Sequence, residues 1–221
     1  EYCNEKDIIL IEDSAHALSS SYSQTKCGSL GSLSIFSFTP HKIITMGQGG
    51  MVLTDNNIFY EYLIALKTFN RSKDKSDWHE GFGLNFKITD LQSSLGISQF
   101  SQVDKLAKNK KKIYKKYKEK LKNVDILDFK NHETPWFIDI ICDSQETRKN
   151  LSIYLSEKNI ETRDSYPALS TQEYLANIEK QNLNSSESIA DKILWIPSST
   201  NLSEEEIDYI STSINNFFNQ N

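Results

Sequence analysis

Short apolar runs separated by polar turns characterise the first part of the chain. Residues 8–11 (IILI) are continuously apolar, which is typical of a parallel strand that is covered on both faces. Residues 33–38 (LSIFSF) predict a second strand, which must stop before Pro40 because proline has no N–H to donate to a ladder. Residues 51–54 predict a third short strand. This pattern favours an α/β domain.

Apolar side chains recur at helical spacing further along. Residues 57–69 and the lysine-rich residues 104–122 place them three and four positions apart, so we predict a helix in each segment. Residues 89–92 (TDLQ) and 203–206 (SEEE) match a capping box, in which two side chains satisfy the free N–H groups of a helix start. We therefore expect one helix to start near Asp90 and the last helix to follow the second box.

A second, smaller α/β unit is predicted after the lysine-rich segment. Residues 136–142 (WFIDIIC) are strand-like, residues 145–159 form an amphipathic helical pattern, and residues 160–166 read as an extended return. We predict two domains, 1–110 and 111–221, with the boundary inside the lysine-rich helix.

The composition is that of an ordinary globular protein. Of 221 residues, 38% are hydrophobic and 25% are charged, and the net charge is −5. We interpret the lysine-rich helix as one with a solvated basic face, because an acidic chain without a groove-binding motif is a poor nucleic-acid binder. No apolar run is long enough to cross a membrane. We therefore expect a cytoplasmic protein without a nucleic-acid or membrane partner.

Cysteine and histidine spacing gives no sign of disulfides or of a metal site. Cys3, Cys27 and Cys142 are scattered and odd in number, and the four histidines form no HExxH or comparable set. We expect no bound metal.

An acid, a hydroxyl and a lysine follow the predicted strands in that order. Asp13 comes just after the first strand, Ser37 near the end of the second, and Lys42 on a bend beside residues 47–50 (GQGG). Ligands of open α/β sheets bind at the carboxyl edge of the strands, where these residues should lie. A lysine can form a Schiff base, an acid can keep a pyridine nitrogen protonated, and a hydroxyl can bind phosphate. The set therefore has the groups that a pyridoxal phosphate site needs.

Each of these residues also has a simpler interpretation. Asp13 can cap a helix that begins near Ser14, and Lys42 can be a solvated surface lysine. His16 can be an ordinary packed or exposed histidine, and the glycines can mark a turn. The ordered set, and no single member of it, favours a cofactor site.

Five segments resemble the DegT/DnrJ/EryC1/StrS sugar aminotransferases, a pyridoxal phosphate-dependent family of fold type I. They lie in the family's order along almost the whole chain: IEDSAHAL (11–18), GSLGSLSIFSFTPHKIITMGQGG (28–50), GLNFKITDLQSSLGISQF (83–100), IETRDSYPALSTQEYL (160–175) and ILWIPSSTNLSEEEIDYI (193–210). The resemblance implies part of the large domain, a mostly parallel sheet with helices on both faces, followed by a smaller α/β C-terminal domain. Family members are longer, so it also implies a carboxyl-terminal portion whose missing part holds a phosphate-binding loop and a stacking aromatic residue.

The resemblance implies a role for each matching residue. Lys42 matches the Schiff-base lysine, which would also move a proton between substrate and cofactor. Asp13 matches the acid that faces the pyridine nitrogen, and His16 occupies a position against the cofactor ring or its phenolic oxygen. Ser37 matches the phosphate-binding serine. Asn85 matches an asparagine that reaches the cofactor phosphate of the partner subunit, which implies a homodimer.

Four positions bear on which reaction the family resemblance implies. Gln48 replaces a commoner glutamate, as in relatives that act on 4-keto sugars, and Ser170 replaces a histidine that often binds substrate. Lys87 replaces an arginine, which keeps the charge but loses bidentate geometry. Some sugar dehydratases of the family have histidine at the lysine position, so Lys42 disfavours that chemistry here.

These features predict a pyridoxal phosphate-dependent aminotransferase, or a fragment of one, in polysaccharide biosynthesis. The resemblance implies that the amino group passes from glutamate to a nucleotide-linked 4-keto-6-deoxy sugar, and the residue variants favour one of the perosamine type. Two alternatives stay open: a dehydratase or isomerase on the same scaffold, and a non-catalytic remnant that acts as a binding or assembly partner. A fragment is expected to bind the cofactor weakly and to be inactive alone.

Overall fold

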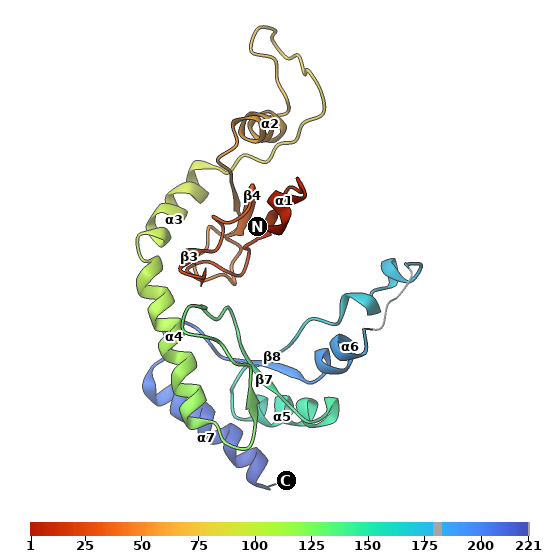
Figure 1. Ribbon diagram of the computed structural model, residues 1–221. Helices are drawn as coiled ribbons and strands as arrows, with labels where there is room; N and C mark the ends of the chain where they lie inside the picture. The colour runs from red at the N-terminus through yellow and green to blue at the C-terminus, as the bar shows by residue number, and fades with distance from the viewer. Residues whose placement is uncertain (179–182, 221) are drawn as a thin grey trace. The chain divides into compact units, whose positions relative to one another are not determined.

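The computed structural model describes residues 1–178 and 183–220 of the chain, which Figure 1 draws as a ribbon. Two compact units make up the chain: unit 1 comprises Glu1–Ala107 and Asn131–Trp136, and unit 2 comprises Lys108–Lys130 and Phe137–Asn221. Each unit combines helices with a β-sheet, which confirms the predicted α/β class. The assignment of a large and a small domain stays a prediction. None of the described helices is both long and apolar enough to span a bilayer.

The sheet of unit 1 brings the ends of two strands to one edge. Its strands, in spatial order, are β1 (Ile11–Asp13), β4 (Leu33–Ser37) and β5 (Gly50–Leu53). β1 and β4 run parallel, with Asp13 opposite Ile35, whereas β5 runs antiparallel to β4. Because β1 and β4 are parallel, their last residues, Asp13 and Ser37, lie at the same edge of the sheet. A two-stranded ribbon, β2 (Ser21–Tyr22) with β3 (Thr25–Lys26), lies in the connection between them.

The prediction of a fully covered strand at residues 8–11 is wrong. Only Ile11 belongs to β1, and the four apolar side chains are between 41% and 59% exposed. β1 is an edge strand of a three-stranded sheet, and the side chains of Ile11 and Asp13 in it are exposed. The apolar run is therefore an uncovered surface of the chain.

The helices that lie wholly in unit 1 differ in how they start: two have a side-chain cap, and the first has none. They are α1 (Tyr2–Glu5), α2 (Asn57–Lys67) and α3 (Asp90–Phe100). The predicted capping box of α3 is confirmed: the N–H of Gln92 donates to Thr89 Oγ1 at 3.3 Å, and the N–H of Thr89 donates to Gln92 Oε1 at 2.9 Å. A longer helix, α4 (Val103–Lys120), begins in unit 1 and continues in unit 2.

Unit 2 contains an antiparallel sheet and its own core. The strands, in spatial order, are β6 (Asp125–Ile126), β7 (Ile138–Ile141), β9 (Ile193–Ile196) and β8 (Arg163–Asp164). The helices are α5 (Gln145–Glu157), α6 (Asn184–Ala190) and α7 (Glu204–Gln220), with short 3-10 turns at Leu169–Thr171 and Glu173–Leu175. Side chains of α4, α5, α7 and the two central strands meet in the core, where Tyr117, Leu151 and Ile214 are fully buried. The second capping box, Ser203 with Glu206, is confirmed at the start of α7.

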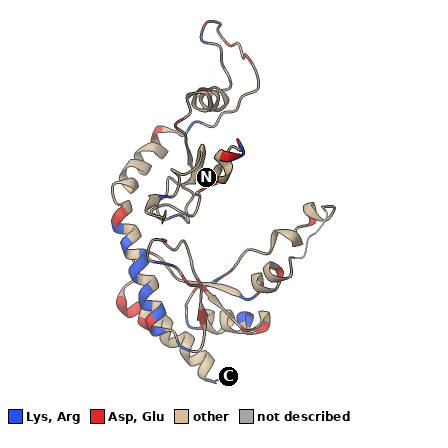
Figure 2. Cartoon of the chain, in the orientation of Figure 1, with Lys and Arg blue, Asp and Glu red and all other residues tan. Residues whose placement is uncertain are grey.

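The lysine-rich helix is less solvated than its sequence predicts. Figure 2 colours Lys and Arg residues blue, and these blue positions are concentrated along α4. Two of them pair with carboxylates of α7, Lys116 with Glu204 and Lys120 with Asp208, each at 2.5 Å. Lys110 is buried, and its Nζ donates to Ser198 O at 2.5 Å and to Ser198 Oγ at 2.8 Å. The lysines of this helix thus join elements of unit 2 as well as face water.

Candidate functional site

Asp13 stands at the carboxyl end of β1 with its carboxylate turned into the following turn. The N–H of Ala15 donates to Asp13 Oδ1 at 3.1 Å, and the N–H of Ser14 donates to Ile35 O at 3.0 Å. No helix follows, because residues 14–20 form turns. The simpler role of Asp13 as a helix cap therefore does not apply, although its carboxylate does close a local turn.

Lys42 lies on a bend between β4 and β5, as predicted. Its N–H donates to Thr39 O at 3.1 Å, and the N–H of Met46 donates back to Phe38 O at 2.9 Å. Phe38, Ile44 and Met46 form a small buried cluster that fixes both ends of this bend. The Lys42 side chain is half-buried above this anchored backbone.

Trp136 completes the surroundings of Lys42, and sequence reasoning missed it. The Nζ of Lys42 lies 4.0 Å from the centroid of the Trp136 ring. The same ring stacks on His16, with centroids 3.5 Å apart and an interplanar angle of 29°. The sequence pattern predicted a strand from Trp136, but β7 starts only at Ile138, so Trp136 lies in the segment before the strand. Only the tertiary fold joins it to Lys42, so no local pattern signals the contact.

The charges of Lys42, His16 and Asp13 act on one another. Partial burial lowers the pKa of Lys42, and the negative charge of Asp13 opposes this without reversing it. Partial burial also lowers the pKa of His16; the charge of Lys42 lowers it further, and that of Asp13 opposes. The structure therefore brings three of the five predicted residues into one electrostatic cluster. A depressed amine pKa makes the nucleophilic neutral form of Lys42 easier to reach.

Glu12, which sequence reasoning also missed, holds the scaffold beside this cluster. Its carboxylate accepts hydrogen bonds from the N–H groups of Gly28, Leu30 and Gly31 at 2.6–2.8 Å. Burial pushes the pKa of Glu12 up, but the three N–H donors outweigh it and the pKa is lowered. A Cβ on Gly31 would lie 2.8 Å from Leu10 O, so this loop can approach β1 only with glycine there. Glu12 thus ties the loop before β4 to the strand that carries Asp13.

The remaining two predicted residues are placed differently. Ser37 Oγ lies 3.4 Å from Thr39 Oγ1, which sets two hydroxyls side by side at the end of β4. Asn85 is exposed on another segment, where it forms an isolated bridge with Thr68. Within the described residues, no hydrogen bond or ion pair joins Asn85 to the other four candidates. Its role toward a partner subunit stays a prediction.

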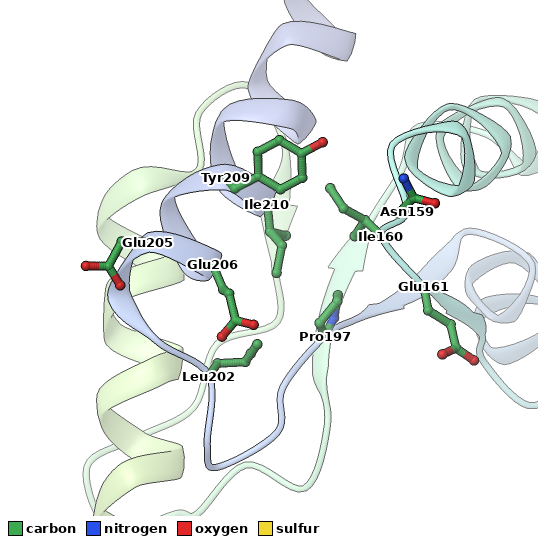
Figure 3. A pocket seen from close by; sticks show the side chains of 9 residues that line it. All are labelled: Asn159, Ile160, Glu161, Pro197, Leu202, Glu205, Glu206, Tyr209 and Ile210. Atoms are coloured by element: carbon green, nitrogen blue, oxygen red, sulfur yellow. The ribbon is translucent and has the colours of Figure 1, made fainter.

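A separate cavity of about 450 Å³ lies in unit 2 and is shown in Figure 3. Its walls combine apolar and acidic side chains: Asn159, Ile160, Glu161, Pro197, Leu202, Glu205, Glu206, Tyr209 and Ile210. Two of its polar groups already have partners in the protein. Glu206 accepts from the N–H of Ser203, and the Tyr209 hydroxyl donates to Lys158 O at 3.1 Å. None of the five predicted site residues lines it.

Comparisons with known proteins agree with the sequence and the fold. The model of the DegT/DnrJ/EryC1/StrS aminotransferase family matches residues 1–215. The GDP-perosamine synthase of Escherichia coli O157:H7 is 30% identical over 226 residues, which cover 99% of this chain and 60% of that protein. The chain therefore spans about three fifths of the length of this relative.

Solved structures show the same fold. PseC of Helicobacter pylori, an aminotransferase involved in the biosynthesis of pseudoaminic acid, superposes with a TM-score of 0.91 at 23% identity, covering 100% of this chain and 62% of that one. Spr1654 of Streptococcus pneumoniae in its PLP-form gives a TM-score of 0.88 at 22% identity, covering 100% and 60%. The predicted fold type I architecture is confirmed, and so is pyridoxal phosphate as the cofactor found among the relatives.

Proposed function

This chain belongs to the DegT/DnrJ/EryC1/StrS aminotransferase family, and we propose that it carries the Lys42 part of a pyridoxal phosphate-dependent active site. The observation that supports this most directly is the cluster of Lys42, Asp13 and His16 at the carboxyl edge of the sheet. Such an edge is where ligands of α/β sheets bind.

The groups present in this cluster fit the cofactor. Lys42 is half-buried, and no described residue accepts a hydrogen bond from its Nζ, so the amine is chemically available. Asp13 supplies a carboxylate within electrostatic range of that amine. Ser37 and Thr39 supply two hydroxyls of the kind that bind a phosphate. When bound, pyridoxal 5'-phosphate supplies an electron sink for the negative charge that develops on the substrate carbon.

Each residue then has a definite task. Lys42 would bind the cofactor covalently through Nζ and, when released, move a proton at the substrate carbon, since its lowered pKa favours the neutral base. Asp13 would hold the proton on the ring nitrogen, because a carboxylate stabilises a cation beside it. His16 would lie against the ring or its phenolic oxygen. Asn85 would reach the cofactor phosphate of the other subunit in a homodimer.

For the substrate we propose a nucleotide-linked 4-keto-6-deoxy sugar of the perosamine type, with glutamate as amino donor. The GDP-perosamine synthase relative and the Gln48 variant support this choice. The presence of Lys42 disfavours the dehydratase alternative. The alternative of a non-catalytic remnant predicts no covalent cofactor binding at all.

Cofactor titration separates these possibilities. We expect excess pyridoxal phosphate to bind the chain covalently, with the accompanying absorbance change, and Lys42→Ala to abolish that change because no other amine lies in the cluster. Lys26→Ala, at an exposed lysine of β3, is the matched control and should bind as the wild type does. Unchanged covalent binding in Lys42→Ala would contradict the proposal.

A further inference from the structure

Trp136 makes three contacts with the candidate site at once. Its ring lies 4.0 Å from the Nζ of Lys42 and stacks on His16 at 3.5 Å. Its Nε1–H donates to His41 O at 2.9 Å, on the same bend that carries Lys42. The indole is therefore fixed by a hydrogen bond at its edge, while its π system faces the histidine and the lysine.

The segment that carries Trp136 is itself anchored in unit 1. The N–H of Ser21 donates to His132 O at 3.0 Å, and the N–H of Thr134 donates to Ser20 Oγ at 3.0 Å. Thr134 and Pro135 are buried immediately before the tryptophan. The position of the ring is thus set by the fold of the segment.

The Lys42 ammonium has an unusual environment for a half-buried charge. No hydrogen bond or ion pair links its Nζ to any residue that the structure describes. The charged groups that face it are Asp13, from the end of β1, and His16, from the next turn. A carboxylate in direct contact would hold the ammonium through a strong hydrogen bond and occupy its protons. An aromatic face attracts the same charge but offers no acceptor atom.

We propose that Trp136 is a positioning residue that holds the side chain of Lys42 in place when its Nζ is not covalently bound. Its ring holds the ammonium at the site without offering a hydrogen-bond acceptor atom, and the same ring stacks on His16. Lys42 would thus stay aimed at the cluster whenever its Nζ is not covalently bound, and its protons would stay available for transfer. This inference rests on the proposed role of Lys42.

Competitive acetylation tests the effect of Trp136 on the Lys42 amine without any cofactor. The 221-residue chain is acetylated across a range of pH values, and the Lys42 peptide is quantified to give its acid dissociation constant. Trp136→Leu and Trp136→Met keep apolar cover but remove the ring, and Trp136→Phe restores a ring. The control is Trp78→Leu, because Trp78 carries a similar cation contact, with Lys75 at 4.9 Å, elsewhere in unit 1.

Loss of the aromatic face destabilises the ammonium, so the Lys42 acid dissociation constant should rise about two- to fivefold in the Leu and Met variants. The Phe variant should fall between these and the wild type, and Trp78→Leu should match the wild type. Circular dichroism checks that each variant is folded. If either Trp136→Leu or Trp136→Met does not fold, the result for the other variant tests the inference. An unchanged or smaller constant in a folded ring-less variant would overturn the inference. Failure of the proposed function is a separate outcome, because the wild-type chain would then not bind pyridoxal phosphate at Lys42.

Discussion

At the scale of single residues, the sequence pointed to candidate site residues but not to the side chains around them. Lys42, Asp13 and His16 are recognisable because each lies close to a strand end, and strand ends of a parallel pair meet at one edge. Trp136 and Glu12 were missed for a physical reason. Trp136 reaches Lys42 only through the tertiary path of residues 131–136, and an acid inside a strand looks like a solvated side chain until its backbone donors are in place.

Asp13→Asn tests whether the acid serves the cofactor. In an active enzyme that contains this segment, turnover should fall about a hundredfold or more while part of the cofactor binding is kept, because an amide cannot stabilise a protonated ring nitrogen. Asp55→Asn, at an exposed acid in the loop after β5, should have no effect. Steady-state rates and cofactor affinity are the measurements. Near-wild-type turnover in Asp13→Asn would contradict a role toward the cofactor. The function of Asp13 would then be limited to closing the turn through its hydrogen bond with Ala15.

At the scale of elements, helix starts were predictable and strand coverage was not. The two capping boxes are local signals, and both helices begin where those signals lie. The cover of β1 depends instead on what packs against it, so an apolar run that is typical of a buried strand is exposed here. The burial of Lys110 in α4 could not be predicted for the same reason, since its partner Ser198 lies in a distant loop.

Lys110 should give unit 2 a pH-dependent stability. Burial lowers its pKa from 10.5 to about 8, and the charge of Asp139 opposes that shift. Between about pH 8 and 10.5 the unfolded chain binds this proton more than the folded chain does, so the contribution of Lys110 to stability rises with pH there. The free energy of unfolding of the wild type minus that of Lys110→Met should increase by about 3 kcal/mol across this window.

Denaturant unfolding at several pH values measures this difference. Lys115 is an exposed lysine of the same helix. The free energy of unfolding of the wild type minus that of Lys115→Met should therefore not increase across this pH window. A difference between wild type and Lys110→Met that stays flat from pH 8 to 10.5 would mean that the buried amine keeps an ordinary pKa.

At the scale of the whole molecule, unit 1 exposes many large apolar side chains. Besides residues 8–11, the α3 side chains Leu91, Ile97 and Phe100 are between 61% and 85% exposed. Extended patches of this kind, and uncovered edge strands, mark interaction surfaces. The chain also spans only about three fifths of the GDP-perosamine synthase that it resembles.

The chain by itself should therefore self-associate as its concentration rises. Ile9→Lys, just before β1, and Ile97→Lys on α3 should each weaken the association, because a charge on the exposed apolar patch opposes its burial in a contact. Ile153→Lys, at a 60% exposed isoleucine of α5 in unit 2, is the control and should not weaken it. Sedimentation velocity reports the species present. A single monomeric species at every concentration would contradict this prediction.

Borohydride trapping tests whether Lys42 is the lysine that binds the cofactor. The chain is incubated with pyridoxal phosphate, reduced with borohydride to fix any cofactor on its lysine, digested, and mapped by mass spectrometry. We predict that the label lies on the peptide that contains Lys42, since this amine combines a lowered pKa with a nearby acid and lies on a fixed bend. A label on other lysines, with Lys42 unmodified, would contradict it.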